Sequence, residues 1–410
     1  MRYPGLLCLF FLLGCVSSKK NSYHQNDAMY QHAISLAHSY IITDGHIDLP
    51  YRLKVKNFRL DREYLGIPIE TTEGDFDYVR AKKGGLDAPF MSIFIPSSYQ
   101  QDLSEAKALA DTLINMIEGI IAAHPDKFAK GDSPDVIDEN FRQGLISLPM
   151  GMENGAPIET LDDLRYFYQK GIRYVTLTHG KDNHICDSSY DTTGTWSGLS
   201  PYGHQLLDAM NSIGMIVDVS HISDKTFYQV MDQTRAPVLA THSSCREFTP
   251  GFERNMNDDM LRALRDNGGV IQINFGSSFL SPGFKESREA NRNKLNELLA
   301  RKGLAADDPK AKPVIEKFSK KNPTLFADVG LVADHIDHVR DVAGIDHVGL
   351  GSDYDGVGDS LPTGLKDVSM YPNLIYELLR RGYTDEDIEK ICYKNVWRVW
   401  HRVNEIAASS

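Results

Sequence analysis

Cysteine is scarce in this sequence, with five residues in a chain of 410. Two of them, Cys8 and Cys15, fall within the first fifteen residues, which leaves Cys186, Cys245 and Cys392 for the rest of the chain. No CxxC pair or other close spacing occurs among them. This pattern argues against a disulfide framework and against a thiolate zinc site. We therefore expect three isolated thiols that pack as small apolar groups.

An excess of positive charge is missing, as are the motifs of two common enzyme classes. The formal net charge is -12 at pH 7, which argues against nucleic acid as a partner. No GxGxxG turn follows the first strand-like run, so a dinucleotide-binding sheet is disfavoured. No GxSxG elbow is present either, although Ser243 and Ser244 directly follow a histidine. A serine nucleophile is therefore disfavoured as well.

A membrane-spanning hydrophobic run is not found at the N-terminus. The apolar stretch that follows Arg2 and ends at Leu13 is too short to cross a bilayer and is typical of a signal peptide. It ends in LLGC, which resembles the lipobox of bacterial lipoproteins. We expect a signal peptide over 1–14, a lipid on the sulfur of Cys15 and a polar tether over 15–26. The lipid would hold the protein on the periplasmic or outer face of the bacterial cell envelope. A plain signal peptide with an incidental cysteine is the alternative.

Short strand-like runs alternate with longer helical patterns through the rest of the chain. Eight runs are rich in β-branched and other apolar residues, at 39–48, 88–96, 144–155, 171–180, 214–221, 236–244, 268–276 and 347–356. Strands that alternate with helices predict a parallel sheet of βα units. Eight such units predict a (β/α)8 TIM barrel of the α/β class, formed by a single domain over 27–410. We expect an insertion at 285–343 before the last strand and three helices at the C-terminus; a doubly wound open sheet is the alternative.

Polar residues follow six of the eight predicted strands. In a barrel of this kind the chemistry lies at the carboxyl ends of the strands. Alternation of side chains along a strand would direct these residues into the barrel mouth. Asp355 is a weaker candidate than Asp353 because it lies further into the last loop. The residues at the strand ends are His46, Asp48, Glu153, His179, His221, His242 and Asp353.

These strand-end residues form a set that suits metal ions. A single histidine at a strand end is more often a hydrogen-bonded structural group than a ligand, but the joint placement favours a site. Three imidazoles and two carboxylates suffice to bind two divalent ions, and nitrogen and oxygen donors without thiolate suit zinc. Glu153 lies on a strand between the two groups of residues, so it is the candidate to bridge two Zn²⁺ ions.

The motifs that carry these residues are similar to those of the membrane (renal) dipeptidase family, a branch of the amidohydrolase-type barrels. The resemblance runs from about residue 43 to residue 400 and keeps the motifs in one order. The matching segments are GHIDLP, GMENG, RYVTLTH, DVSH, THSS, ERNM, GSDYDGV and LKDVSMYPNL. The family hydrolyses dipeptides, and some members accept a D-residue at the C-terminal side or open carbapenem lactams.

The resemblance implies a ligand set for each metal ion. His46 and Asp48 would hold one zinc ion, and His221 and His242 would hold the other. Glu153 would bridge the two ions. The cysteine that follows the RYVTLTH histidine in animal members is replaced here by GKDNHICDSS, and no hydrophobic tail ends the chain. Disulfides and the C-terminal glycolipid anchor of animal members are therefore not expected here.

The resemblance also implies roles for three further residues. His179 would contact the substrate near the scissile carbonyl, and Arg254 would bind the terminal carboxylate of the substrate. Asp353 would accept a proton from a metal-bridging hydroxide or water and pass it to the leaving amine. The resulting expectation is a dizinc metallopeptidase acting on dipeptides. A related enzyme acting on N-acyl amino acids or β-lactams, and a metal-free binding lipoprotein, are the alternatives. The sequence leaves the oligomeric state open, with a homodimer among the options.

Overall fold

Eight parallel strands form one sheet in the order β1-β2-β5-β6-β7-β8-β9-β10. The sheet curls until its two edges meet, where Ile47 at the end of β1 forms a parallel bridge with Tyr354 after β10. The amide of Asp48 donates to the carbonyl of Tyr354 at 2.9 Å, and the amide of Asp353 donates to the carbonyl of His46 at 3.1 Å. The barrel strands are β1 (Ile42–Ile47), β2 (Leu86–Phe94), β5 (Met150–Glu153), β6 (Ile172–Thr176), β7 (Ile216–Asp218), β8 (Leu239–Ser243), β9 (Val270–Ile273) and β10 (Val348–Leu350).

This architecture comes from a computed structural model that describes residues 27–55, 69–71 and 73–410. The predicted (β/α)8 barrel is confirmed, with one barrel strand in each of the eight predicted runs except that the second begins two residues earlier. The predicted signal peptide over 1–14, the lipid on Cys15 and the tether over 15–26 lie outside the described residues. They stay predictions.

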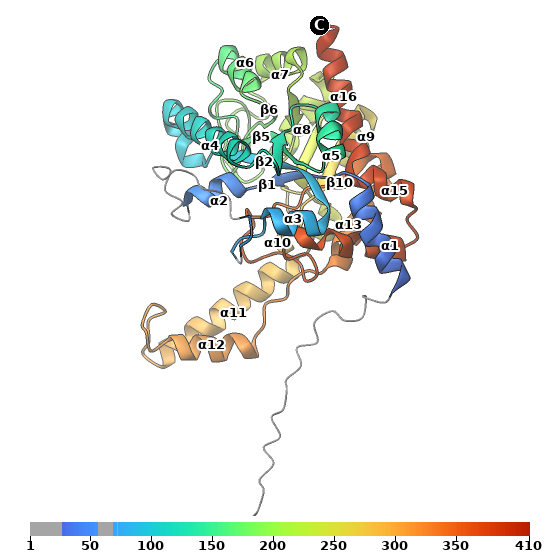
Figure 1. The fold of residues 1–410 in the computed structure, drawn as a ribbon. Coiled ribbons are helices and arrows are strands. Elements are labelled where there is room, and N and C mark those ends of the chain that lie inside the picture. Colours follow the sequence, from blue (N-terminus) through green and yellow to red (C-terminus); the bar gives the residue numbers. More distant parts are fainter. Residues whose placement is uncertain (1–26, 56–68, 72) are drawn as a thin grey trace, which may run out of the picture.

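Helices cover the outside of the barrel, as buried parallel strands require (Figure 1). They are α1 (Ala28–Ser39), α2 (Leu49–Val55), α3 (Tyr78–Gly84), α4 (Leu103–Ala123), α5 (Pro134–Arg142), α6 (Leu161–Gln169), α7 (Pro201–Ile213), α8 (Asp224–Gln233), α9 (Asp258–Asn267), α10 (Ser277–Leu280), α11 (Pro282–Arg301), α12 (Lys312–Lys321), α13 (Val329–Ala343), α14 (Tyr371–Arg380), α15 (Asp385–Glu389) and α16 (Asn395–Ala408). Short 3-10 turns lie at Ser97–Gln101, Arg246–Phe248, Ile345–His347 and Val368–Met370, and a π-turn at Lys390–Lys394 joins α15 to α16.

The predicted third run is split into two strands. Residues Ile146–Leu148 form β4, which pairs with β3 (Phe128–Lys130) in a separate two-stranded sheet, and only β5 belongs to the barrel. Pro149 lies between β4 and β5. Proline has no amide hydrogen to donate, so it ends one ladder, while its carbonyl accepts from Met91 of β2 at 2.8 Å. The apolar pattern of the run did not show that its two halves pair with strands of different sheets.

The predicted insertion before the last strand contains a hairpin of two helices, α11 and α12. In Figure 1 these helices stand apart from the barrel, and α11 starts next to α10 at its edge. We call residues 282–321 the arm. Among the described residues, no helix is both long enough and apolar enough to cross a bilayer.

The three cysteines of the described chain are buried and free of disulfides, as predicted. Burial raises the pKa of the Cys392 thiol to about 12 and raises that of Cys245 above its usual range. These thiols therefore stay protonated and pack as apolar groups.

Candidate metal centre and active site

The carboxyl ends of the strands surround a cavity of about 1120 Å³. Five of the predicted site residues line it: Asp48, Glu153, His179, His221 and Asp353. The side chains of His46 and His242 are almost completely buried next to the same cluster. The structure thus brings together the seven residues that the sequence placed at strand ends.

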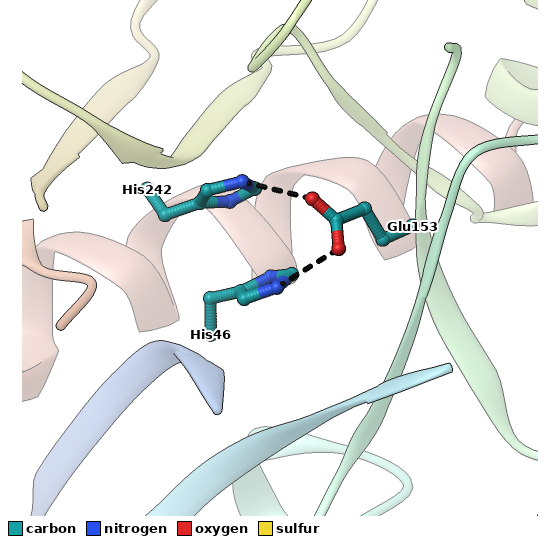
Figure 2. Close-up of side chains that lie close together, drawn as sticks. All are labelled: His46, Glu153 and His242. Carbon is teal, nitrogen blue, oxygen red and sulfur yellow. Dashed lines mark ion pairs between the residues drawn. The ribbon is translucent and has the colours of Figure 1, made fainter. Parts of the chain in front are cut away.

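Glu153 is the centre of this cluster. Its two carboxylate oxygens face different histidines: Oε2 lies 3.3 Å from His46 Nε2, whereas Oε1 lies 3.0 Å from His221 Nε2 and 3.1 Å from His242 Nε2. Figure 2 shows the carboxylate beside the rings of His46 and His242, with one oxygen directed at each ring. Asp48 stands on the His46 side, with its Oδ2 3.5 Å from His46 Nε2. One carboxylate therefore faces two separate donor groups.

The donor atoms in the cluster lack protein partners that would satisfy them. His46 Nε2 and Asp48 Oδ1 are buried without a hydrogen-bond partner among the described residues. The Nε2 atoms of His221 and His242 face each other at 2.9 Å. Burial alone would lower the pKa of His46, but Tyr174, Glu153 and Asp48 raise it well above the ordinary value. The cluster is therefore built to hold positive charge, and its nitrogen and oxygen donors fit a divalent metal ion.

Hydroxyl groups behind the rings set the direction of two histidines. The Tyr174 hydroxyl donates to the carbonyl of Gly45 at 3.0 Å, so its oxygen accepts from Nδ1 of His46 at 3.0 Å. Nδ1 thus carries the proton and Nε2 is directed at the carboxylates. Tyr174 reaches this place because position 151 is glycine; a Cβ on Gly151 would lie 1.9 Å from the Tyr174 ring.

The same arrangement recurs at His242. The hydroxyl of Thr241 donates to the Asp218 carboxylate at 2.7 Å, and its oxygen lies 2.8 Å from Nδ1 of His242. Asp218 is fully buried at the end of β7. Since a carboxylate has no proton to give, the Thr241 oxygen must accept from His242, which leaves a lone pair on Nε2.

Electrostatics of the centre favour neutral imidazoles at His221 and His242 and an ionised glutamate. Burial lowers the pKa values of His221 and His242 well below the ordinary range, with a further contribution from the Arg254 charge. Burial would raise the pKa of Glu153, but the surrounding histidines outweigh it and hold that pKa well below the usual range. Neutral nitrogen and ionised oxygen are the forms in which these groups bind metals.

Comparison with known proteins identifies the family to which this chain belongs. The model of the membrane dipeptidase family (peptidase family M19) matches residues 30–410. The chain belongs to this family. It is therefore a dipeptidase, and a metallopeptidase by family, as the resemblance implied.

Relatives of this dipeptidase cover most of its length. An uncharacterized dipeptidase of Schizosaccharomyces pombe is 34% identical over 386 residues, covering 89% of this chain and 81% of the relative. The dipeptidase tcpJ of Claviceps purpurea is 32% identical over 374 residues, covering 89% of this chain and 78% of the relative. The crystal structure of the probable dipeptidase PvdM of Pseudomonas aeruginosa superposes with a TM-score of 0.77 at 28% identity, covering 92% of this chain and 99% of that one.

Two residues of the dipeptidase reach the cavity from loops with left-handed backbone. His221 has φ 70° and Asp353 has φ 62°. Their strands end at Asp218 and Leu350, so they lie beyond the region in which side chains alternate between faces. Both residues lie at the barrel mouth, as predicted. The left-handed turns direct them there, however, and not the alternation of side chains along a strand that the prediction assumed. For side chains other than glycine this conformation is uncommon and is concentrated at functional sites.

Asp353 has an environment suited to exchanging protons. Its Oδ2 accepts from the Asn274 amide at 2.8 Å. Burial and the neighbouring charge of Asp48 raise the pKa of Asp353 to about 8. Gly356 allows this arrangement, because a Cβ there would lie 2.1 Å from Asp48 Oδ2 and 2.2 Å from Asp353 Oδ1.

Asp355, the second-ranked candidate, is directed away from the metal cluster. It accepts from the amide of Asp75 at 2.7 Å and lies 3.1 Å from Nε of Arg52. Its own amide donates to the Asp75 carboxylate at 2.8 Å. These contacts fasten the loop that carries Asp353 to the segment after α2, so Asp355 has a structural role.

His179 and Arg254 lie next to the cluster. His179 stands at the cavity wall against the ring of Phe94, with its Nε2 3.7 Å from Glu153 Oε1. Arg254 is buried and donates to Ser243 Oγ at 2.7 Å and to the His242 carbonyl at 2.8 Å, while its Nε has no partner among the described residues. Arg254 supports the strand end of His242, and carboxylate binding by Arg254 stays a prediction.

Several residues that support the site were missed from the sequence. Most of their side chains act on residues that come from other strands, so no local motif announces them, whereas Thr241 directly precedes its partner His242 on β8. Asn274 directly follows β9. The sequence pattern was taken to place only apolar or small residues at the end of this run, although an asparagine at a strand end is itself a signal for a site residue. The missed residues are Ser92, Tyr174, Asp218, Thr241 and Asn274.

Proposed function

We propose that this protein is a dizinc dipeptidase in which Glu153 bridges two metal ions. The division of the Glu153 oxygens between His46 on one side and His221 with His242 on the other carries this proposal. Asp48 would complete the first ion's ligands. The all-nitrogen-and-oxygen donor set supports zinc as the metal. Bound there, zinc would supply Lewis acidity that activates a water molecule and polarises the peptide carbonyl.

Residues of the chain would orient the peptide and move its protons. Burial lowers the pKa of His179, so the ring is neutral near pH 7 and can donate one N–H to the carbonyl oxygen as negative charge develops there. In its ionised form Asp353 would accept a proton from the attacking water, and its raised pKa would let it hold that proton until it passes to the leaving amine. Arg254 would attract the terminal carboxylate by its buried charge.

A dipeptide panel with a metal measurement tests this proposal. The panel contains L,L-dipeptides, matched dipeptides with a D-residue at the C-terminal side, and N-acetyl amino acids, each assayed with and without chelator. We expect dipeptide hydrolysis that chelator abolishes and zinc restores, and two zinc ions per chain by elemental analysis. Asp353→Asn should keep both ions and lose turnover by about 100-fold or more.

The outcomes separate the parts of the proposal. Fewer than two ions per chain in a fully active enzyme would contradict the dinuclear centre. Faster cleavage of N-acetyl amino acids than of every dipeptide would favour the alternative amidohydrolase activity. Full turnover in Asp353→Asn would move the proton transfer to another group.

A further inference from the structure

The cavity above the metal centre extends to the arm. Its volume of about 1120 Å³ exceeds the roughly 300–1,000 Å³ typical of pockets that enclose drug-sized ligands. One end is formed by the metal-centre residues. The far wall belongs to α11 and α12 and is lined by Phe284, Lys285, Arg288, Arg292, Leu295 and Phe318. Part of a substrate held at the metal centre can therefore extend toward α11.

The arm is basic in an otherwise acidic molecule. Residues 282–321 contain eleven Lys and Arg against six Asp and Glu, a formal net charge of +5 in a chain of net charge -12. Three of these cations, Lys285, Arg288 and Arg292, are spaced three and four residues apart on α11. This spacing places them on one face of the helix, and all three line the cavity. Glu289 lies on the same face and also lines the cavity, so this face keeps a formal net charge of +2 (three cations and one carboxylate).

The three cations have no carboxylate partner. Among the described residues no Asp or Glu oxygen forms an ion pair with Lys285, Arg288 or Arg292, whereas Arg301 at the end of the same helix pairs with Glu297 at 3.4 Å. The Lys285 ammonium lies 3.7 Å from the centre of the Phe252 ring instead. An aromatic face holds a cation without neutralising its charge. The positive charge therefore remains available to a ligand in the cavity.

A wall of aromatic rings connects these cations to the metal centre. Tyr190 lies 5.8 Å from the His221 ring and 6.0 Å from the Phe252 ring, measured between centroids. Phe252 in turn lies 5.8 Å from Phe279 and carries Lys285 on its face. A substrate that contacts this wall passes from the metal ligands to the basic face of α11.

We propose that the basic face of α11 is an anion subsite that selects dipeptides carrying a second carboxylate on an Asp or Glu side chain. The inference rests on the proposed dipeptidase function, since a dipeptide has no anionic group apart from its terminus and such side chains. The subsite is separate from Arg254, which is buried below the cavity next to His242. Attraction by several unpaired cations at a cavity wall lowers KM and raises the association rate more than it changes turnover.

Neutral substrates of the same shape test the subsite. The values of kcat/KM are compared for Ala-Glu against Ala-Gln and for Glu-Ala against Gln-Ala. Within each pair the two substrates differ only in one side-chain carboxylate, so the ratio of their kcat/KM values measures the effect of that carboxylate. The two pairs together show which residue of the dipeptide reaches the arm. We expect at least one ratio to exceed one in the wild type and to fall about three- to tenfold in the Arg288→Gln/Arg292→Gln double variant, mainly through KM. High salt should lower the same ratio.

A matched variant on the same helix controls for general loss of charge. Lys294 follows Lys285 by about two and a half turns of α11, so it lies on the opposite side of the helix, and it does not line the cavity. Lys294→Gln should therefore keep the wild-type ratio. Ratios near one in the wild type, or an equal ratio in the double variant, would overturn the subsite and leave the dipeptidase function intact. Failure to cleave any of the four dipeptides would instead refute the dipeptidase function, and the subsite with it.

Discussion

The orientation of two imidazoles in the metal centre, those of His46 and His242, depends on a hydroxyl group behind each ring. Tyr174 and Thr241 each give their only hydroxyl proton to another acceptor, so each oxygen accepts from a histidine Nδ1. The Nε2 atoms of His46 and His242 are then directed at Glu153. Metal affinity in such sites depends on these partners nearly as much as on the ligands.

Asp218→Asn should weaken metal binding without unfolding the chain. An amide at this position can donate to Thr241, whose hydroxyl would then donate to His242 Nδ1 and move the imidazole proton to Nε2. We expect metal affinity to fall by about 10- to 100-fold, measured by competition with a chromogenic chelator. Circular dichroism would check the fold.

Asp87→Asn provides the matched control for this change. Asp87 is also a buried aspartate on a barrel strand, but it lies at the start of β2, far along the strand from the metal centre. Its substitution should leave metal affinity unchanged. Wild-type affinity in Asp218→Asn would show that Thr241 does not set the state of His242.

At the scale of elements, the strand ends were predictable and the loops beyond them were not. Apolar runs with a polar last residue gave the positions of His46, Glu153 and His242, because burial forces those runs into parallel strands. The left-handed turns at His221 and Asp353 depend on contacts with neighbouring loops, such as the one between Asp353 and Asn274. No local pattern in the sequence contains those contacts.

One buried histidine joins α13 to the barrel and makes that contact sensitive to pH. His335 Nδ1 accepts from the amide of Cys245 at 3.0 Å, and its Nε2 donates to the carbonyl of Leu280 at 3.0 Å. Both nitrogens are therefore used by the neutral ring. Burial lowers the pKa of His335 to about 4, from 6.5 for an ordinary histidine.

This histidine should make the fold less stable in mild acid. Because its folded-state pKa is below the unfolded value, the unfolded chain takes up the proton first as the pH falls. The stabilisation is complete above about pH 6.5 and is lost as the pH falls toward 4, by about 3 kcal/mol at most. His335→Asn keeps an acceptor for Cys245 but cannot be protonated.

Urea unfolding at pH 7 and pH 5 measures the effect. We expect His335→Asn to be less stable than the wild type at pH 7 and to lose less stability between the two pH values. His401→Asn, at an exposed position on α16, should follow the wild type. Equal losses in all three proteins would show that His335 does not cause the acid sensitivity.

At the scale of the whole molecule, the arm is the feature that the sequence announced least clearly. Its helices were predicted as an insertion, and its positive charge can be counted. Which face of α11 looks onto the cavity depends on how α10 and α11 leave the barrel edge, which is a property of the assembled fold (Figure 1). The sequence alone therefore does not show that these cations face the cavity.

The metal centre should also stabilise the whole barrel. Its ligands come from the ends of four strands, β1, β5, β7 and β8, and two acidic groups, Asp48 and Asp353, lie in one buried cluster with His46. A cation that binds only the folded chain stabilises it by about 4 kcal/mol at a thousand times its dissociation constant. Without a cation, repulsion between Asp48 and Asp353 would add to the loss.

Removal of metal should therefore lower the unfolding temperature by roughly 5 °C, because each kcal/mol shifts it by on the order of 1 °C in a domain of this size. Calorimetry of the wild type with and without chelator measures this shift, and added zinc should reverse it. His242→Ala removes one ligand, so chelator should shift its unfolding temperature less than it shifts that of the wild type. An equal unfolding temperature for the metal-loaded and metal-free wild type would show that the strand ends are held together by protein contacts alone. In that case Tyr174, Thr241 and Asp218 would preorganise the ligands fully before any ion binds.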